Sequence, residues 1–297
     1  MHQRTKAHLA LLFTNIFFAI NYSAVKQLIN EGLVKPFALN LLRVGVSSIL
    51  LWSLLFFSKE KARLHKKDLG RFALCALTGI AINQLLFIKG LSMTYSIHAS
   101  LLMLTTPILI TFFAAWVLKE RINKIKVAGL LMGITGATVL IASRENSGNA
   151  SQVLLGDVLI IINAVSYTIY FILVKPLMTE YRPMTVIRMI FAMGFFMILP
   201  FCWNEFREIP WQQYRVTSYG LLALIIIGGT FFAYLFNVYG IKILGAAKAG
   251  TYIYSQPVFA AAIAVIFMKE TLSLYKIIAA ACIFTGVYLS TKTQSNG

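Results

Sequence analysis

Polar side chains that interrupt long apolar runs are the residues of this sequence that could do chemistry. Two groups of them each precede a proline. His98, Thr105 and Thr106 come before Pro107, and a second group comes before Pro257: Lys248, Thr251, Tyr252, Tyr254, Ser255 and Gln256. A proline inside a helix removes one hydrogen bond and clashes with the carbonyl one turn back. Within a bilayer such a break persists only where protein or a water-filled cavity satisfies the backbone. We therefore expect both stretches to face the inside of a helix bundle, and a tolerated kink without a mechanistic role is the alternative.

Further amides and phenols lie in other apolar runs. Polar groups in hydrocarbon need partners, so these side chains are expected to converge inside the bundle, either around a ligand or as bonds between helices. The predicted substrate-binding residues are Asn15, Asn21, Tyr22, Asn83, Gln84, His98, Thr105, Asn163, Tyr167, Tyr170, Asn237, Lys248, Tyr252 and Gln256.

Two arginines, Arg43 and Arg188, each follow a proline by a turn or two, after Pro36 and Pro183. A guanidinium at this depth costs a few kcal/mol unless it is paired or reaches the interface. We predict that these arginines, like Pro107 and Pro257, serve gating or structure. Snorkelling to lipid headgroups is the alternative.

The motifs that the sequence lacks narrow the function. There is no Walker loop, zinc pattern, serine elbow or paired carboxylate next to the four histidines, so we expect no enzyme, no cofactor and no metal. All ten carboxylates stand at or outside the ends of apolar runs, which leaves no visible proton acceptor at the midplane. Proton coupling would then fall to His98, to tyrosines or to Asp157.

Composition places the chain in a membrane. Of its 297 residues 59% are hydrophobic and 12% charged, with a mean hydropathy of +0.76, which is too little polar surface for a water-soluble globule. The net charge of +17 would suggest nucleic acid in a soluble protein. Here the basic residues stand between apolar runs and set orientation, so no nucleic-acid partner is expected.

Ten apolar runs are long enough, at about 20 residues each, to cross a bilayer as helices. Their approximate limits are 8–28, 37–57, 70–89, 94–118, 125–142, 155–174, 184–202, 217–239, 247–268 and 275–291. Lysine and arginine are most frequent in the segments that share a side with the N-terminus, which predicts that both termini are cytoplasmic.

The two halves of the chain repeat each other. A shift of 150 positions aligns Gly90 with Gly240, Pro107 with Pro257 and Lys119-Glu120 with Lys269-Glu270 without a gap. This pattern predicts two five-helix units, 1–146 and 147–297. Because each unit has an odd number of spans, the second must be inverted, a common construction of secondary transporters. The predicted fold is an all-α membrane protein of ten transmembrane helices in two inverted five-helix repeats.

Small residues mark the fifth and tenth runs. Gly129, Gly133 and Gly136 are matched by Ala279 to Ala281 and Gly286, at spacings that let helices approach closely. They predict packing within the chain, or else the surface of a homodimer, so the chain is either a monomer or a homodimer.

The closing piece of each half, Pro107-ILITFFAAWVLK-Glu120 and Pro257-VFAAAIAVIFMK-Glu270, resembles the drug/metabolite transporter superfamily, EamA type. The resemblance covers nearly the whole chain and implies an inner-membrane carrier with a central cavity. It suggests a secondary transporter, and an exporter in particular, of small metabolites such as amino acids or related organic anions by alternating access. Export of amphiphilic drugs is one alternative, and a non-transporting scaffold or lipid-binding protein is another.

Overall fold

A computed structural model describes residues 2–54, 64–118, 124–142, 152–244 and 252–292, and within these ranges the chain is helical without a strand. The predicted all-α class is confirmed. The elements are α1 (His2–Asn30), α2 (Pro36–Ser53), η1 (Lys66–Asp68), α3 (Leu69–Ala76), η2 (Leu77–Ala81), α4 (Ile82–Met93), α5 (Ser96–Met103), α6 (Thr105–Leu118), α7 (Lys124–Ala142), α8 (Val153–Glu180), α9 (Pro183–Arg207), η3 (Trp211–Gln213), α10 (Val216–Ala223), η4 (Leu224–Phe232), α11 (Ala233–Leu244), η5 (Ile253–Ser255), α13 (Gln256–Met268) and α14 (Leu274–Lys292).

Six of the helical stretches are long and apolar enough to cross a membrane. Four shorter apolar helices accompany them, at Ser96–Ile110, Val127–Leu140, Ile253–Met268 and Leu274–Leu289. Each predicted span overlaps one of these ten stretches. The predicted joint between the repeats, residues 143–154, lies mostly outside the described residues.

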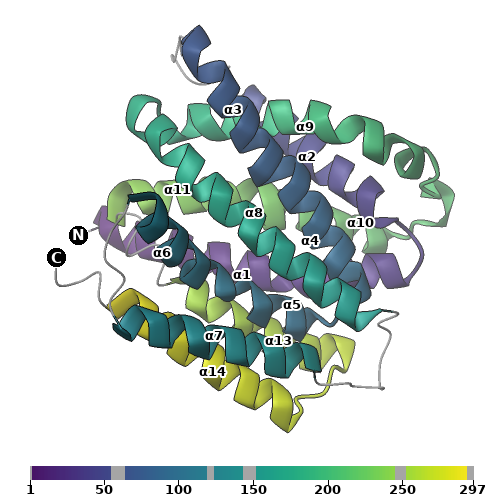
Figure 1. The fold of residues 1–297 in the computed structure, drawn as a ribbon. Helices are drawn as coiled ribbons and strands as arrows, with labels where there is room; N and C mark the ends of the chain where they lie inside the picture. Colours follow the sequence, from purple (N-terminus) through teal and green to yellow (C-terminus); the bar gives the residue numbers. More distant parts are fainter. Residues whose placement is uncertain (1, 55–63, 119–123, 143–151, 245–251, 293–297) are drawn as a thin grey trace.

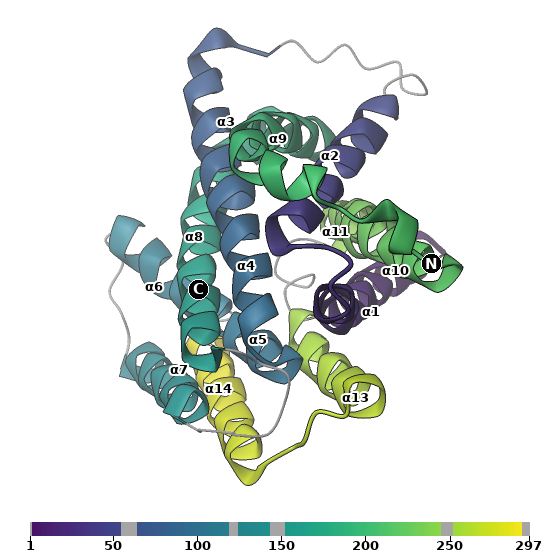
Figure 2. The same ribbon diagram turned by 90° about the vertical axis from the view of Figure 1, so that its right-hand side faces the viewer.

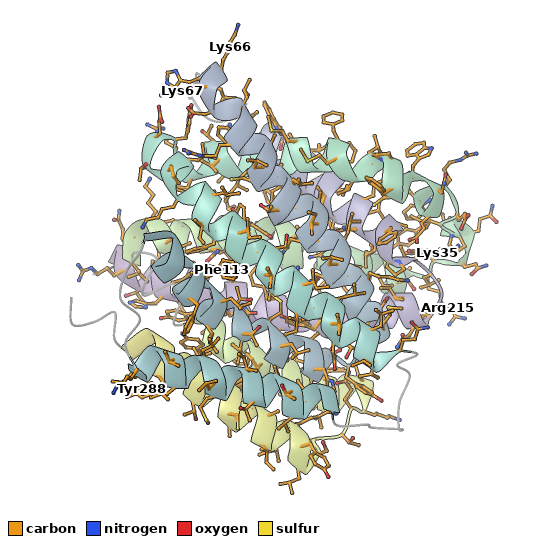
Figure 3. The ribbon with its side chains drawn as sticks, viewed as in Figure 1. Lys35, Lys66, Lys67, Phe113, Arg215 and Tyr288 are labelled. Atoms are coloured by element: carbon orange, nitrogen blue, oxygen red, sulfur yellow. The ribbon has the colours of Figure 1, made fainter. Side chains whose placement is uncertain are left out.

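The helices run roughly along one common direction, so the bundle has two ends (Figure 1). We call the end that holds the start of α1 the N end, and the opposite end, where Figure 3 places Lys35 and Arg215, the far end. Viewed along the bundle in Figure 2, α2 and α9 lie on one side and α7 and α14 on the other. The helices α1, α4, α5, α8 and α11 lie between them, and α13 lies on the side of α14. Most of the polar residues predicted to meet are on the middle helices.

Structural equivalence of the halves extends to unusual helix geometry. Both η2 and η4 are π-helical, and the 150-residue shift places one within the other. Gln84 of α4 donates a hydrogen bond to the hydroxyl of Tyr234 on α11 (3.3 Å), and these two positions are themselves equivalent under the shift. The hydrogen bond therefore joins two positions that are equivalent in the two halves. π-Helical turns are frequent at functional sites, and sequence periodicity did not reveal these two.

The small residues of the fifth and tenth runs pack within the chain. A side chain at Gly286 would lie 2.6 Å from the carbonyl oxygen of Gly129, and one at Gly136 would lie 2.8 Å from that of Ala279. Helices α7 and α14 are thus in backbone contact, as small residues allow. The close approach of these small residues is therefore made within the chain.

The two prolines interrupt their helices as expected. Helix α5 ends at Met103 before α6 begins, and α13 begins next to Pro257 after the short η5. Thr105 donates its hydroxyl to the carbonyl of Leu102 (2.7 Å), and Ser255 donates to Tyr252 (2.6 Å). These are equivalent positions, and hydroxyls are the groups that satisfy backbone freed by proline in a membrane.

A carboxylate of the second half caps a helix of the first half at the far end. Glu205 accepts hydrogen bonds from the backbone N–H of Phe37 (2.7 Å) and Ala38 (3.2 Å), where α2 begins. Nearby, Lys35 donates to Glu208, and this bond raises the pKa of the exposed Lys35 ammonium above its ordinary value. Both contacts hold the two repeats together at the far end.

Candidate functional site

Several of the predicted substrate-binding amides bridge helices. Asn163 on α8 donates to the carbonyl of Asn83 on α4 (2.6 Å), and Asn83 donates back to the carbonyl of Asn163 (3.4 Å). Gln256 on α13 donates to the side-chain oxygen of Asn15 on α1 (2.7 Å). These four residues lie together in pairs inside the bundle, where they act as bonds between helices.

The arginines predicted to gate are both 3% exposed, so neither reaches the bilayer interface. Arg43 donates from Nε to the hydroxyl of Thr230 (3.1 Å), in the π-helical η4. Arg188 donates to the carbonyl of Leu51 (3.2 Å) and lies over the ring of Trp52 (5.9 Å to its centroid). Both arginines therefore tie α2 to elements of the second repeat.

The remaining predicted residues fall into separate contacts. Asn21 packs on Gly229, because a Cβ atom placed at Gly229 would lie 2.7 Å from the amide oxygen of Asn21. Other contacts are the edge-on ring of Tyr22 against Phe87, the ring pair Tyr167 and Tyr170, and the hydrogen bond between Tyr252 and His8 (2.6 Å). Asn237 is half-buried on α11, and Lys248 lies outside the described residues. The structure does not bring all the predicted residues around one cavity.

A group of charged residues is buried at the far end. Lys26 on α1 donates to the backbone carbonyl of Thr94, and its ammonium lies 3.7 Å from the carboxylate of Glu270, with both side chains almost fully buried. Asp157 on α8 accepts a hydrogen bond from the hydroxyl of Thr94 and lies 3.0 Å from Nδ1 of His98. The side chains of His98 and Asp157 are 0% exposed. Lys276 completes the group, because its ammonium and that of Lys26 each lie 4.9 Å from the ring centroid of Tyr95.

We call Lys26, Thr94, His98, Asp157, Glu270 and Lys276 the buried charge network. Asp157 and Glu270 stand near the ends of helices, as the sequence placed them, but both are buried among cations. Sequence distance concealed the network, since its members come from four separate stretches of chain.

Glu270 also closes the far end by capping a helix. Its two carboxylate oxygens accept hydrogen bonds from the backbone N–H of Ser96 (2.8 Å) and Ile97 (3.1 Å), where α5 begins. A carboxylate at a helix N-terminus is favoured by the helix dipole and by the unsatisfied N–H groups there. Lys269 directs Glu270 toward α5, because it ends α13 in the left-handed region (φ 56°) and turns the chain.

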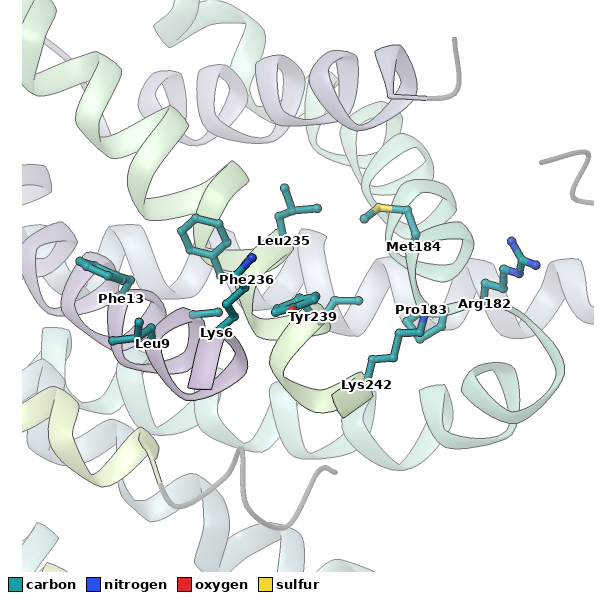
Figure 4. A pocket seen from close by; sticks show the side chains of 12 residues that line it. Lys6, Leu9, Phe13, Arg182, Pro183, Met184, Leu235, Phe236, Tyr239 and Lys242 are labelled. Atoms are coloured by element: carbon teal, nitrogen blue, oxygen red, sulfur yellow. The ribbon is translucent and has the colours of Figure 1, made fainter. Parts of the chain in front are cut away.

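A cavity of about 870 Å³ opens at the N end, between α1, α9 and α11 (Figure 4). Its wall is mostly apolar and includes Phe13, Phe236 and Tyr239. Three basic residues, Lys6, Arg182 and Lys242, line it as well, and among the described residues no acidic side chain does. The predicted substrate-binding residues that the structure describes do not line this cavity. Sequence analysis assigned its basic residues only to orientation, and only the packing of α1 on α11 shows that they meet.

Comparison with known proteins shows that the chain is similar to membrane transporters. The model of the EamA-like transporter family matches the chain twice, at residues 5–142 and 154–292. An "Uncharacterized transporter" of Archaeoglobus fulgidus is 25% identical over 291 residues, covering 98% of this chain and 99% of the relative. A "Probable terminal-alkyne amino-acid exporter" of Streptantibioticus cattleyicolor is 25% identical over 289 residues, covering 96% and 93%.

A solved structure shares the fold. The protein described only as "Crystal structure of protein" superposes with a TM-score of 0.63 over 99% of both chains, at 20% sequence identity.

Proposed function

The chain belongs to the EamA-like transporter family and is a multi-pass membrane transporter, not an enzyme, and from this premise we propose that it exports small metabolites by alternating access. The observation that supports this most is the difference between the two ends of the bundle. The N end holds an open cavity, while the far end is closed by the buried charge network. This arrangement is expected of a carrier in a conformation that is open to one side of the membrane and closed to the other. We place the chain in the inner membrane with both termini in the cytoplasm, because most lysines and arginines fall in the sequence segments predicted to share a side with the N-terminus.

The cavity favours an organic anion or a zwitterionic amino acid with an apolar body. Among the described residues the largely apolar wall holds three cations and no carboxylate, which attracts a negative group and disfavours a cation. The apolar and aromatic wall suits the rest of such a molecule. The amino-acid exporter of Streptantibioticus cattleyicolor, similar over nearly the whole chain, supports the same substrate class.

Removing single charges from the cavity tests this substrate class. We expect Lys6→Gln and Lys242→Gln each to lower kcat/KM for a carboxylate substrate by about three- to tenfold, because one charge contact of about 1 kcal/mol is lost. Transport of amino acids and of a lipophilic cation into inverted vesicles is the measurement. Lys175→Gln is the matched control, because Lys175 is exposed near the same end on α8 but does not line the cavity. If kcat/KM fell equally in the two cavity variants and in Lys175→Gln, the assignment would be contradicted. The same would follow if kcat/KM fell in neither cavity variant.

The proposed orientation predicts which end an impermeant thiol reagent reaches. In a variant without Cys75, Cys202 and Cys282, a cysteine at exposed Gln212 of the far end should react from outside intact cells. One at exposed His65 should react only after the membrane is opened. Labelling of both positions from one side would show that the two ends do not lie on opposite faces.

A further inference from the structure

We propose that His98 and Asp157 form a proton-binding site, at which Nε2 of His98 takes up one proton when the far end of the bundle opens. The proposal rests on the proposed function, in which the two ends of the bundle open alternately. It assigns the residue that binds the coupling proton and the conformation in which the proton is bound.

The hydrogen bonds assign the tautomer of His98. Asp157 accepts from the hydroxyl of Thr94 at one oxygen and lies 3.0 Å from Nδ1 of His98 at the other. An ionised carboxylate only accepts hydrogen bonds, so Nδ1 carries the proton. This leaves Nε2 as a bare nitrogen, and it has no hydrogen-bond partner within the described parts of the chain. Nε2 is therefore the atom that can bind the next proton.

Charge balance explains why that proton is absent in the closed state. The groups that face the pair are Lys26 from α1, Tyr95 from α5, Glu270 from the end of α13 and Lys276 from α14. With His98 neutral, the two ammonium groups balance the two carboxylates. A protonated His98 would leave one uncompensated positive charge where the imidazole is 0% exposed, and burial disfavours such a charge. Opening the far end would admit water and remove this penalty.

The repeat shows that the pair is not a requirement of the fold. The 150-residue shift aligns His98 with Lys248, and a shift of 149 aligns Val25-Lys26 with Val174-Lys175 and therefore Asp157 with His8. Among the equivalent positions the lysine is kept, as Lys175, while the carboxylate and the imidazole have the basic residues His8 and Lys248 as counterparts. A carboxylate paired with an imidazole therefore belongs to only one of the two equivalent sets, which a contact needed only to pack α5 on α8 would not require.

Linkage sets the size of the effect. If the open state binds one more proton than the closed state, lowering the pH favours the open state by up to about tenfold per pH unit.

Thiol accessibility measures this equilibrium without any transport assay. In the cysteine-free variant, Ser96→Cys reports on opening, because Ser96 is 0% exposed beneath Glu270. Its labelling rate is divided by that of Gln212→Cys, an exposed position at the same end, which cancels the pH dependence of thiol reactivity. We expect the ratio to rise severalfold to tenfold per pH unit as the pH falls, and His98→Asn or His98→Gln to abolish the slope.

Two controls separate proton binding from a static hydrogen bond. Thr94→Val removes the hydroxyl bond to Asp157 and should raise labelling at every pH while the slope remains. Replacing His2, His8 and His65 together leaves His98 as the only histidine and should also keep the slope, which assigns it even if the His98 variants do not fold. A flat profile in the parent, or a slope that persists without His98, would overturn the proposal. A pH-dependent ratio without measurable transport would uphold the proton site and refute the proposed function instead.

Discussion

Glu270→Gln is expected to shift the protein toward the state in which the far end is open and to reduce transport severely. The amide keeps the shape of the side chain, but it leaves the ammonium of Lys26 buried without its carboxylate and weakens the cap on α5. Breaking one partner of a buried pair costs about 3–5 kcal/mol, and a change of about 3 kcal/mol shifts a two-state equilibrium by about 100-fold. Labelling of Ser96→Cys should therefore increase by about that factor at neutral pH.

Glu31→Gln is the matched control. It makes the same substitution at the same end, on an exposed carboxylate that accepts a hydrogen bond from Gln27 (3.0 Å). It should leave labelling and transport unchanged. Lys26→Met combined with Glu270→Gln should recover part of the closed state, because the unpaired buried charge is then gone. If Glu270→Gln labelled Ser96→Cys no faster than the parent, Glu270 would not hold the far end closed.

The architecture was predictable because it depends on signals that are local in sequence. Apolar runs of membrane length locate the helices, and the register of Pro107 on Pro257 reveals the duplication. The function of the two prolines in breaking their helices also follows, since proline cannot continue a helix hydrogen-bond ladder. The small residues of α7 and α14 also predicted packing of these helices within the chain, and the structure shows this packing.

The site was less predictable because it depends on how distant helices meet. The amides Asn15, Asn83 and Asn163 were expected to converge inside the bundle, and they do, but as bonds between neighbouring helices. Asp157 and His98 were both named as candidates for proton coupling, but only the structure shows that the two side chains meet and are fully buried. Likewise, a propensity scale cannot distinguish a π-helical turn from an α-helical one, so η2 and η4 were not expected.

Gly156→Ala should destabilise the protein and disturb the proton site together. Gly156 of α8 and Gly90 of α4 are in direct backbone contact: a side chain at Gly156 would lie 2.8 Å from both the carbonyl oxygen of Gly90 and the backbone nitrogen of Thr94. Backbone atoms cannot rotate away, so the helices must separate, and overpacking of this kind typically costs about 1–3 kcal/mol. Because Asp157 is the next residue, the separation also moves its carboxylate away from Thr94 and His98.

Gly220→Ala provides the contrast within the same protein. Gly220 lies in α10, and nothing approaches within 4 Å of the position that a side chain would occupy. Alanine there should be neutral or should stabilise by about 0.4–1 kcal/mol, because it restricts the unfolded chain without strain. Melting temperatures in detergent would compare the two variants, and the labelling ratio of Ser96→Cys would follow the site. Gly156→Ala should melt several degrees lower and lose the pH slope, whereas Gly220→Ala should keep both. A stable Gly156→Ala variant with the parent's slope would mean that this helix contact does not position Asp157.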